Sequence, residues 1–338
     1  MNYQISQEIK EKTPLILAEI KKAKSILLHC HPSPDPDSVG SALAVKFAIE
    51  QLDKKVTVIR GDSEIPSAFM HFPGANDIVQ KSYWEIDPNE YDLFIIVDSA
   101  ISGVSRKKQV ELPADMKVIN IDHHKTNLGD GSINIVDSSY PATAQLLFDI
   151  FTEMNININS DIAINLFMGI YTDTGGFKYE GTKEATFEVA AKLVSICPNF
   201  SKIIAEMENS NTLSDMTMQG AALSAIEVFC NGKVALSIVP YSVIEQKKIQ
   251  DISISAGLIS PIIRTMKGFD IVGVIIEARP NKIKLSFRTG SSNILDVSKL
   301  AASLGGGGHR MAAGVSLDMS LEEAKVVVVQ KIKELYNL

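Results

Sequence analysis

The chain has 338 residues, is 45% hydrophobic and carries a formal net charge of −7 at pH 7. That length and apolar content predict two domains with a sizeable core, and the acidic balance argues against binding long duplex nucleic acid through a broad basic surface. The three cysteines, Cys30, Cys197 and Cys230, form neither a disulfide framework nor a zinc pair, so we expect reduced thiols in a cytoplasmic protein. We expect no signal peptide, and no apolar run reaches the roughly 18 residues that span a bilayer.

The first half of the chain predicts strands that alternate with helices. Lys and Glu alternate with Ile and Leu at helical spacing from about residue 6 to 24, and a short buried strand follows at 25–30. Prolines between His31 and Ser41 predict a rigid loop, with a helix only at 41–52. Alternating elements imply right-handed βαβ units and a parallel sheet. Further strands are expected at 55–60, 91–97 and 118–121, and further helices at 142–154 and 161–170.

The second half predicts a helical connection followed by a smaller domain. We place a metal-binding catalytic domain at 1–186, the connection at 187–222 and a substrate-binding domain at 223–338. Strands are expected at 233–239, 271–277 and 282–288, and the last two are joined by a tight turn and so predict a hairpin. Helices at 295–304 and 321–336 flank a glycine-rich run at 305–310. The expected fold is therefore α/β, with a mainly parallel sheet flanked by helices in the first domain and a mixed sheet in the second.

Acidic and imidazole side chains follow four of the apolar segments in the first half. Parallel strands gather functional groups at their carboxyl ends, so we expect these side chains to converge. Such oxygen and nitrogen ligands suit divalent ions, and imidazole with carboxylates suits Mn²⁺ better than Mg²⁺ alone. The six candidate ligands are His31, Asp35, Asp37, Asp98, His123 and Asp173.

Four converging carboxylates would repel one another, and two divalent ions would neutralise that charge. Two ions about 3.5–4 Å apart can clamp a phosphate during in-line attack, which makes a two-metal site the natural interpretation. Each piece alone has a structural alternative: a turn at Asp35 and Asp37, a helix N-cap at Asp98 and a turn at Asp173. Their joint occurrence at successive element ends favours the metal site. His29 is interpreted as a core or supporting residue and His71 as structural.

Four ordered motifs then carry a resemblance. They are His31-x3-Asp35-x-Asp37-x2-Gly40-Ser41, Val97-Asp98, Asp122-His123-His124 and Asp173-Thr174-Gly175-x-Phe177. With them the chain resembles the DHH phosphoesterases, the superfamily that includes RecJ exonuclease. The run Gly305-Gly306-Gly307-Gly308-His309-x3-Ala313-Gly314 resembles the signature of the DHH-associated C-terminal domain. The short length is similar to the branch of nanoRNases, pAp phosphatases and cyclic di-AMP phosphodiesterases, although Gln145 stands where that family often has Glu.

The resemblance implies roles for single residues. One metal ion would be held by His31, Asp35 and Asp98, and the other by Asp37, Asp98, His123 and Asp173, with Asp98 bridging. Asp122 would orient a neighbouring imidazole, and His124 would contact the scissile phosphate or protonate the leaving oxygen. A bridging hydroxide would attack phosphorus in a short substrate such as nanoRNA, pApA, cyclic di-AMP or pAp. The resemblance also allows a homodimer.

The glycine-rich run predicts a binding site for the nucleotide end of the substrate, in a cleft between the two domains. Glycines let backbone N–H groups approach a phosphate closely, and nearby cations add positive potential. The predicted substrate-binding residues are Arg288, Gly306, Gly307, Gly308, His309 and Arg310. Two alternatives stay open: a phosphatase of a non-nucleotide phosphoester, and a catalytically silent nucleotide-binding sensor.

Overall fold

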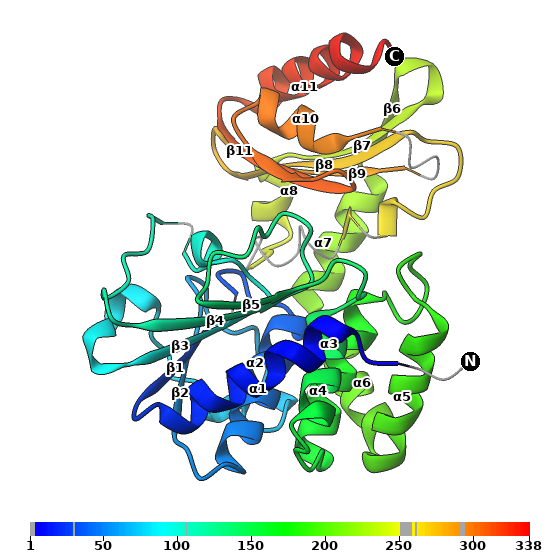
Figure 1. Ribbon diagram of the computed structural model, residues 1–338. Coiled ribbons are helices and arrows are strands. Elements are labelled where there is room, and N and C mark those ends of the chain that lie inside the picture. Colours follow the sequence, from blue (N-terminus) through cyan, green and yellow to red (C-terminus); the bar gives the residue numbers. More distant parts are fainter. Residues whose placement is uncertain (1–3, 30, 106, 251–258, 261, 291–294) are drawn as a thin grey trace. The chain divides into compact units, whose positions relative to one another are not determined.

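The computed structural model describes the chain except residues 1–3, 30, 106, 251–258, 261 and 291–294 and the side chain of His309. The chain divides into two compact units, Met1–Ser210 and Asn211–Leu338 (Figure 1). Three helices lie around this boundary: α5 (Glu184–Ile196), α6 (Phe200–Glu208) and α7 (Leu213–Ser224). The boundary falls inside the range where the helical connection was expected, and the division into three segments stays a prediction.

The first unit is built on a five-stranded sheet in the order β2-β1-β3-β4-β5, in which all neighbouring strands are parallel. This confirms the expected parallel α/β architecture. The fifth strand was not predicted, because its sequence Ile-Asn-Ile-Val is short and only Ile135 is fully buried. The strands are β1 (Ile26–His29), β2 (Val56–Ile59), β3 (Leu93–Val97), β4 (Lys117–Asp122) and β5 (Ile133–Val136).

Both faces of this sheet are apolar, which explains why its strands are continuous hydrophobic runs. Leu28 and Ile95 face the helical layer, whereas Leu27 and Phe94 pack against loops and short 3-10 helices that contribute Tyr83. Each such side chain stabilises the fold by about 1.5–3 kcal/mol when fully buried. The helical layer comprises α1 (Gln7–Lys22), α2 (Pro36–Glu50), α3 (Thr143–Glu153) and α4 (Ser160–Asp173). Short 3-10 helices lie at η1 (Ser67–His71), η2 (Ala75–Asp77), η3 (Tyr83–Glu85), η4 (Pro88–Glu90) and η5 (Ile101–Gly103).

Helix α2 begins at Pro36 and not at Ser41, so the predicted loop was wrong in its second half. Proline is tolerated in the first turn of a helix, because its missing N–H would have no intrahelical partner there. Asp35 is the N-cap, and its Oδ1 accepts a 2.9 Å hydrogen bond from the backbone N–H of Ser38. The consequence is that Asp37 is fixed in the first turn of a buried helix.

The second unit contains a mixed sheet in the order β10-β11-β9-β8-β7-β6, in which only β7 and β8 are parallel. Helices α10 (Val297–Ser303) and α11 (Leu321–Tyr336) cover one face, and α7 and α8 (Tyr241–Gln246) cover the other (Figure 1). The mixed sheet and the β8–β9 hairpin confirm the prediction, whereas β6, β10 and β11 were not predicted. The strands are β6 (Ile226–Phe229), β7 (Val234–Val239), β8 (Ile271–Arg279), β9 (Lys282–Thr289), β10 (Gly307–His309) and β11 (Ala312–Asp318), with η6 at Cys230–Gly232.

The expectations from composition concerned membrane-spanning segments and the state of the cysteines. Among the described residues, no helix has both the length and the apolar character needed to cross a membrane. Cys197 and Cys230 carry free thiols, and Cys30 lies outside the described residues.

Candidate metal centre

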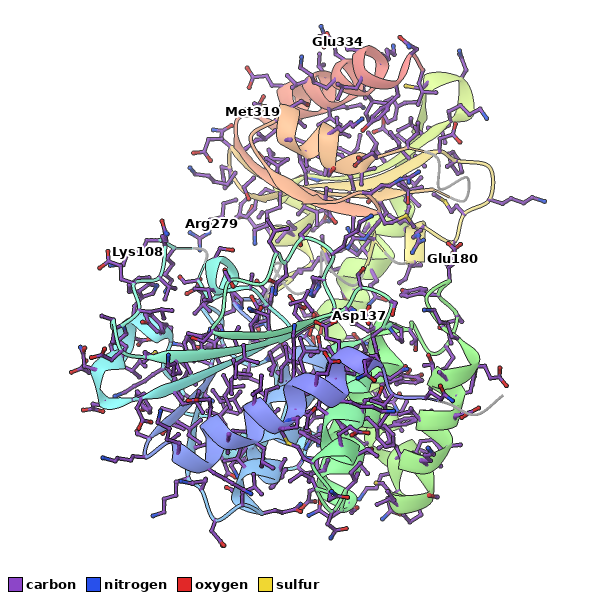
Figure 2. The ribbon with its side chains drawn as sticks, viewed as in Figure 1. Lys108, Asp137, Glu180, Arg279, Met319 and Glu334 are labelled. Carbon is purple, nitrogen blue, oxygen red and sulfur yellow. The ribbon has the colours of Figure 1, made fainter. Side chains whose placement is uncertain are left out.

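Three neighbouring strands bring the predicted ligands to one edge of the first sheet. Strands β1, β3 and β4 are adjacent and parallel, so the segments that follow them meet at their carboxyl ends. Asp98 follows β3, and His123 follows β4. Asp137 follows β5 at the same end of the sheet (Figure 2), and its backbone N–H donates to the carbonyl oxygen of Asp122.

Asp98 is held at the end of β3 in a left-handed backbone conformation, with φ of 58°. A residue with a Cβ adopts this conformation at a cost of about 1–3 kcal/mol, and it persists only where the surroundings fix it. Here the N–H of Asp98 donates to the carbonyl of Ile121 at 2.9 Å, and Thr143 Oγ1 donates to Asp98 Oδ1 at 2.9 Å. The buried carboxylate is therefore aimed by contacts with β4 and with the start of α3.

Asp37 is completely buried where α2 meets the N-terminus of α3. Its two carboxylate oxygens accept hydrogen bonds from the backbone N–H groups of Thr143 at 2.8 Å and Ala144 at 3.0 Å. These groups lack partners within their own helix, and the helix dipole places partial positive charge there, so a carboxylate is favoured. A Cβ at Gly169 of α4 would lie 2.5 Å from Asp37 Oδ1, and glycine is therefore required for this packing.

His123 places one ring nitrogen among three carboxylates. Its Nε2 lies 3.2 Å from Asp173 Oδ2, 3.6 Å from Asp98 Oδ1 and 3.9 Å from Asp37 Oδ2. No described residue forms a well-aligned hydrogen bond with this buried nitrogen. The other ring nitrogen, Nδ1, lies 3.3 Å from the carbonyl oxygen of Tyr140, which fixes the proton on Nδ1 and leaves the Nε2 lone pair for a metal ion.

Asp173 is the last residue of α4, and the chain reverses direction directly after it. Gly175, Gly176 and Phe177 all have positive φ, at 60°, 68° and 63°. This left-handed turn keeps the end of α4 beside His123 and explains the two consecutive glycines.

His124 belongs to a chain of hydrogen bonds behind the cluster. Its Nδ1 lies 2.7 Å from Asp122 Oδ1, and its backbone N–H donates to the same oxygen at 3.0 Å. The second oxygen, Asp122 Oδ2, accepts from Asn127 Nδ2 at 2.8 Å, and Asn127 also donates to Asn120 Oδ1 at 2.7 Å. Asn127, Asn120 and Thr143 were missed from the sequence. Only the buried Asn120 inside an apolar strand could have signalled such a network.

The electrostatics show a site that is unfavourable for bare carboxylates. Burial raises the pKa of Asp98 well above its usual range, and the charges of Asp37 and Asp35 add to the effect. Burial and then Asp173 raise the pKa of Asp37 to about 7. Burial lowers the pKa of His123, but Asp173 and Asp37 outweigh it and raise that pKa to about 9. A positive charge is therefore favoured among these groups, and their oxygen and nitrogen atoms fit divalent metal ions.

Two sets of residues have ligand atoms that all lie within 4.8 Å of one another. One is Asp37, His123 and Asp173, and the other is Asp98, His123 and His124. His31 and Asp35, both predicted ligands, belong to neither set among the described residues. Asp35 is engaged as the cap of α2, and His31 Nδ1 lies 3.0 Å from the carbonyl oxygen of Ser33. Burial, followed by the charge of Asp173, raises the pKa of Asp35, so Asp35 shares the electrostatic field of the cluster. Its role and that of His31 as ligands stay predictions.

The predicted substrate-binding residues lie in the second unit, on β9 and around β10. Gly305 adopts φ of 84°, and the N–H of Gly306 donates to the carbonyl of Ala301 at 2.8 Å. This pattern terminates helix α10, so the run has a structural role beside the predicted one. Gly307, Gly308 and His309 form β10, which pairs with β11. Arg288 Nη1 donates to Ser286 Oγ at 3.0 Å.

Comparisons with known proteins match a family domain in each half of the chain. The description "DHH family, N-terminal domain" matches residues 25–170, and the DHHA1 domain matches residues 232–337. The chain therefore contains an N-terminal DHH domain and a DHHA1 domain. The matched ranges contain the Asp122-His123-His124 motif and the glycine-rich run respectively.

Two relatives align with this chain over nearly their whole length. The chain is 28% identical over 322 residues to a Thermus thermophilus protein named bifunctional oligoribonuclease and PAP phosphatase NrnA, covering 94% of this chain and 93% of the relative. It is 29% identical over 337 residues to a Mycoplasma pneumoniae protein of the same name, covering 97% of each.

Solved structures show the same fold. An exopolyphosphatase-related protein from Bacteroides fragilis superposes with a TM-score of 0.88 at 24% identity and covers 100% of both chains. Exonuclease RecJ bound to manganese gives a TM-score of 0.53 at 14% identity, covering 99% of this chain and 97% of that chain. At these identities the likeness concerns the fold alone.

Proposed function

We propose that this DHH protein is a metal-dependent phosphoesterase that hydrolyses short nucleotides such as nanoRNA, pApA, cyclic di-AMP or pAp to mononucleotides. The observation that carries the proposal is the cluster of Asp37, Asp98, His123 and Asp173, whose buried members are unfavourable without cations. The oligoribonuclease and PAP phosphatase names of the relatives support the substrate class. A cytoplasmic setting and a homodimer stay predictions.

Two divalent ions, Mn²⁺ in our proposal, would activate a water molecule and offset the negative charge that develops on the phosphate oxygens. Asp37, His123 and Asp173 would hold one ion, and His31 and Asp35 would contribute to the other, with Asp98 shared between the two. The contacts of Thr143 with Asp98 and Asp37 fix the two carboxylates before an ion arrives, so little reorganisation is needed.

The protein's own acid–base group in this proposal is His124. Asp122 engages His124 Nδ1 at 2.7 Å, so Nε2 is the nitrogen that can exchange a proton with the leaving oxygen. Burial raises the pKa of Asp122, but hydrogen bonds from His124 and Asn127 outweigh it and bring the pKa below its usual value. Asp122 therefore stays ionised and holds the imidazole in one orientation.

The second unit would bind the nucleotide. Arg288 and Arg310 supply guanidinium groups of the kind that bind phosphate, and β10 supplies glycine backbone that a phosphate can approach closely. The proposed set is Arg288, Gly306, Gly307, Gly308, His309 and Arg310. Because the N–H of Gly306 already donates to Ala301, we expect its neighbours to contribute more to substrate binding.

The decisive experiment is a turnover panel with Mn²⁺ that compares cyclic di-AMP, pApA, a short RNA, pAp and pyrophosphate. We expect AMP release from the linear nucleotides. The same panel is run with Asp98→Asn, which removes the shared carboxylate, and this variant should release no AMP. Turnover confined to phosphoesters without a base would favour the non-nucleotide phosphatase. Tight nucleotide binding without hydrolysis, in protein shown to contain metal, would favour the sensor.

A further inference from the structure

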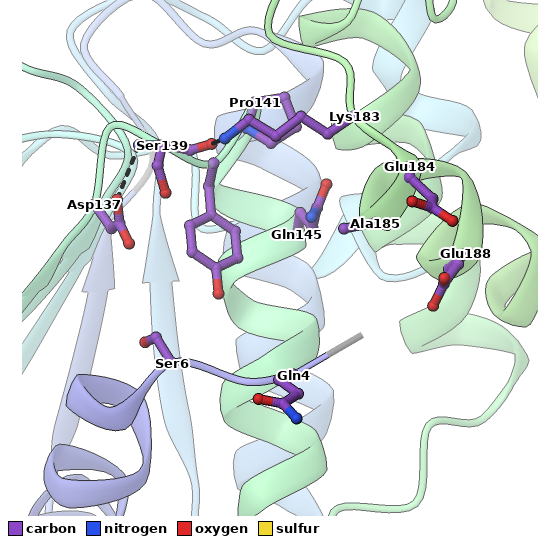
Figure 3. A pocket seen from close by; sticks show the side chains of 11 residues that line it. Gln4, Ser6, Asp137, Ser139, Pro141, Gln145, Lys183, Glu184, Ala185 and Glu188 are labelled. Carbon is purple, nitrogen blue, oxygen red and sulfur yellow. Dashed lines mark hydrogen bonds between the residues drawn. The ribbon is translucent and has the colours of Figure 1, made fainter. Parts of the chain in front are cut away.

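The first unit contains a cavity of about 430 Å³ whose lining includes none of the proposed metal ligands. It is formed by the start of the chain, the segment that follows β5, the first turn of α3 and the start of α5 (Figure 3). A cavity of this size accommodates a small organic molecule. Its polar lining residues include Asp137, Tyr140, Gln145, Lys183, Glu184 and Glu188.

Gln145 points to a missing hydrogen-bond partner in this cavity. Its side chain extends from α3 into the pocket (Figure 3), and the residue is only 3% exposed. No described residue donates a hydrogen bond to Gln145 Oε1. A buried carbonyl oxygen without a donor destabilises the fold, so a ligand with an N–H group would be favoured beside it.

The charges of the lining define the kind of ligand. The lining contains three carboxylates, those of Asp137, Glu184 and Glu188, and one ammonium group, that of Lys183. Lys183 Nζ donates to the carbonyl oxygen of Ser139 at 2.7 Å, and neither glutamate forms an ion pair with any described residue. The three carboxylates are not among the described groups close enough to hold one metal ion, so an extended cation fits better than a bare ion.

The cavity is connected to the metal centre through two shared elements. The carbonyl oxygen of Tyr140 accepts from His123 Nδ1, and Tyr140 itself lines the cavity. The first turn of α3 binds Asp37 through Thr143 and Ala144 and presents Gln145 to the cavity. A ligand that shifts this turn would change the position of metal-binding side chains.

We propose that this cavity is a second binding site, for a small organic cation with N–H donors, an amine or a guanidinium, and that its occupancy is coupled to the metal centre. The ligand's N–H groups would donate to Gln145 Oε1 and to the carboxylates of Glu184 and Glu188. The site is separate from the proposed chemistry, since none of these three residues is a proposed metal ligand.

The test is calorimetric binding of agmatine to the 338-residue protein loaded with Mn²⁺, with uncharged 1,4-butanediol as the control ligand. We expect saturable binding of agmatine and none of the diol. The Glu184→Gln/Glu188→Gln double variant should weaken agmatine binding by about tenfold, because two exposed or half-exposed charges are removed. Glu180→Gln, which removes an exposed charge outside the cavity, should leave the affinity unchanged.

A variant that is expected to strengthen agmatine binding provides a second test. Gln145→Glu adds a carboxylate to the cavity and should strengthen agmatine binding, with a larger rise in Tm on agmatine addition than in the natural chain. Absence of agmatine binding, or equal weakening by Glu180→Gln, would overturn the site. For the coupling, agmatine affinity should differ with and without Mn²⁺, because linkage is reciprocal. Equal affinities in the two conditions would overturn the connection to the metal centre.

Discussion

The cluster of carboxylates and imidazoles in the first unit and the glycine-rich run of the second are built in different ways. In the first, Asp37 and Asp98 are buried and each is held by backbone or side-chain groups of α3, which lies far away in the sequence. In the second, the contacts of the run are mostly local, with α10 and with the paired strand β11. A buried site fixed from several elements suits reacting groups, whereas a local, more exposed site can vary with the substrate.

The largest expected effect comes from breaking the buried site at its shared carboxylate. Asp98→Asn should lower kcat by about a thousandfold or more and weaken metal binding, because it removes a charge that both ions would share. Steady-state kinetics and metal analysis of the purified protein measure this. Asp115→Asn, at an exposed position, is the matched control. Near-normal turnover of Asp98→Asn would refute the assignment of Asp98.

The next effect tests whether the network behind the cluster matters. Asn127→Ala removes the donor to Asp122 Oδ2, so Asp122 and His124 lose their fixed orientation. We expect activity to fall about 10–100-fold, the usual range for groups that orient the reacting side chains. Asn89→Ala changes an exposed asparagine and should have no effect. Equal activity of the two variants would show that the network serves the fold only.

A substitution in the second unit should change substrate binding and leave metal binding unchanged. Arg288→Ala should raise KM for pApA by about tenfold while kcat and metal content change little, because the guanidinium is proposed to bind substrate in both ground and transition states. Arg279→Ala, at the exposed end of β8, is the control. Loss of bound metal in Arg288→Ala would contradict the division of roles between the two regions.

The smallest effect concerns the pH dependence of stability without metal. The pKa of Asp37 is raised from 3.8 to about 7, so the folded state binds more protons than the unfolded state between these values. Stability should therefore fall as pH rises from about 4 to 7, and the raised pKa of His123 extends the decline toward pH 9. Thermal unfolding with a chelator should show this decline, and Asp37→Asn should flatten it by a few degrees. A steeper decline in Asp37→Asn would contradict the argument.

Periodicity and strand-end chemistry were sufficient to predict the parallel sheet, the hairpin and the residues that gather around His123. They were not sufficient for β10 and β11, because glycine and alanine carry no strand pattern, nor for the start of α2, where Pro36 was interpreted as a breaker. The supporting roles of Thr143 and Asn127 depend on contacts between distant segments, and single residues of these types give no local signal. For His31 and Asp35 the sequence predicts more than the structure shows. Their spacing predicts metal ligands, but in the described residues neither belongs to a group of side chains close enough to hold one ion.

Because Asp98 has a left-handed backbone conformation, stability and the proposed function favour different residues at this position. Glycine would adopt the same φ without a steric penalty, so replacing Asp98 by glycine relieves backbone strain and removes a buried charge. Selection for heat resistance alone would therefore favour glycine at residue 98, at the expense of the metal ligand that we propose there. The proposed role of Asp98 as a metal ligand would explain why an aspartate occupies this strained position.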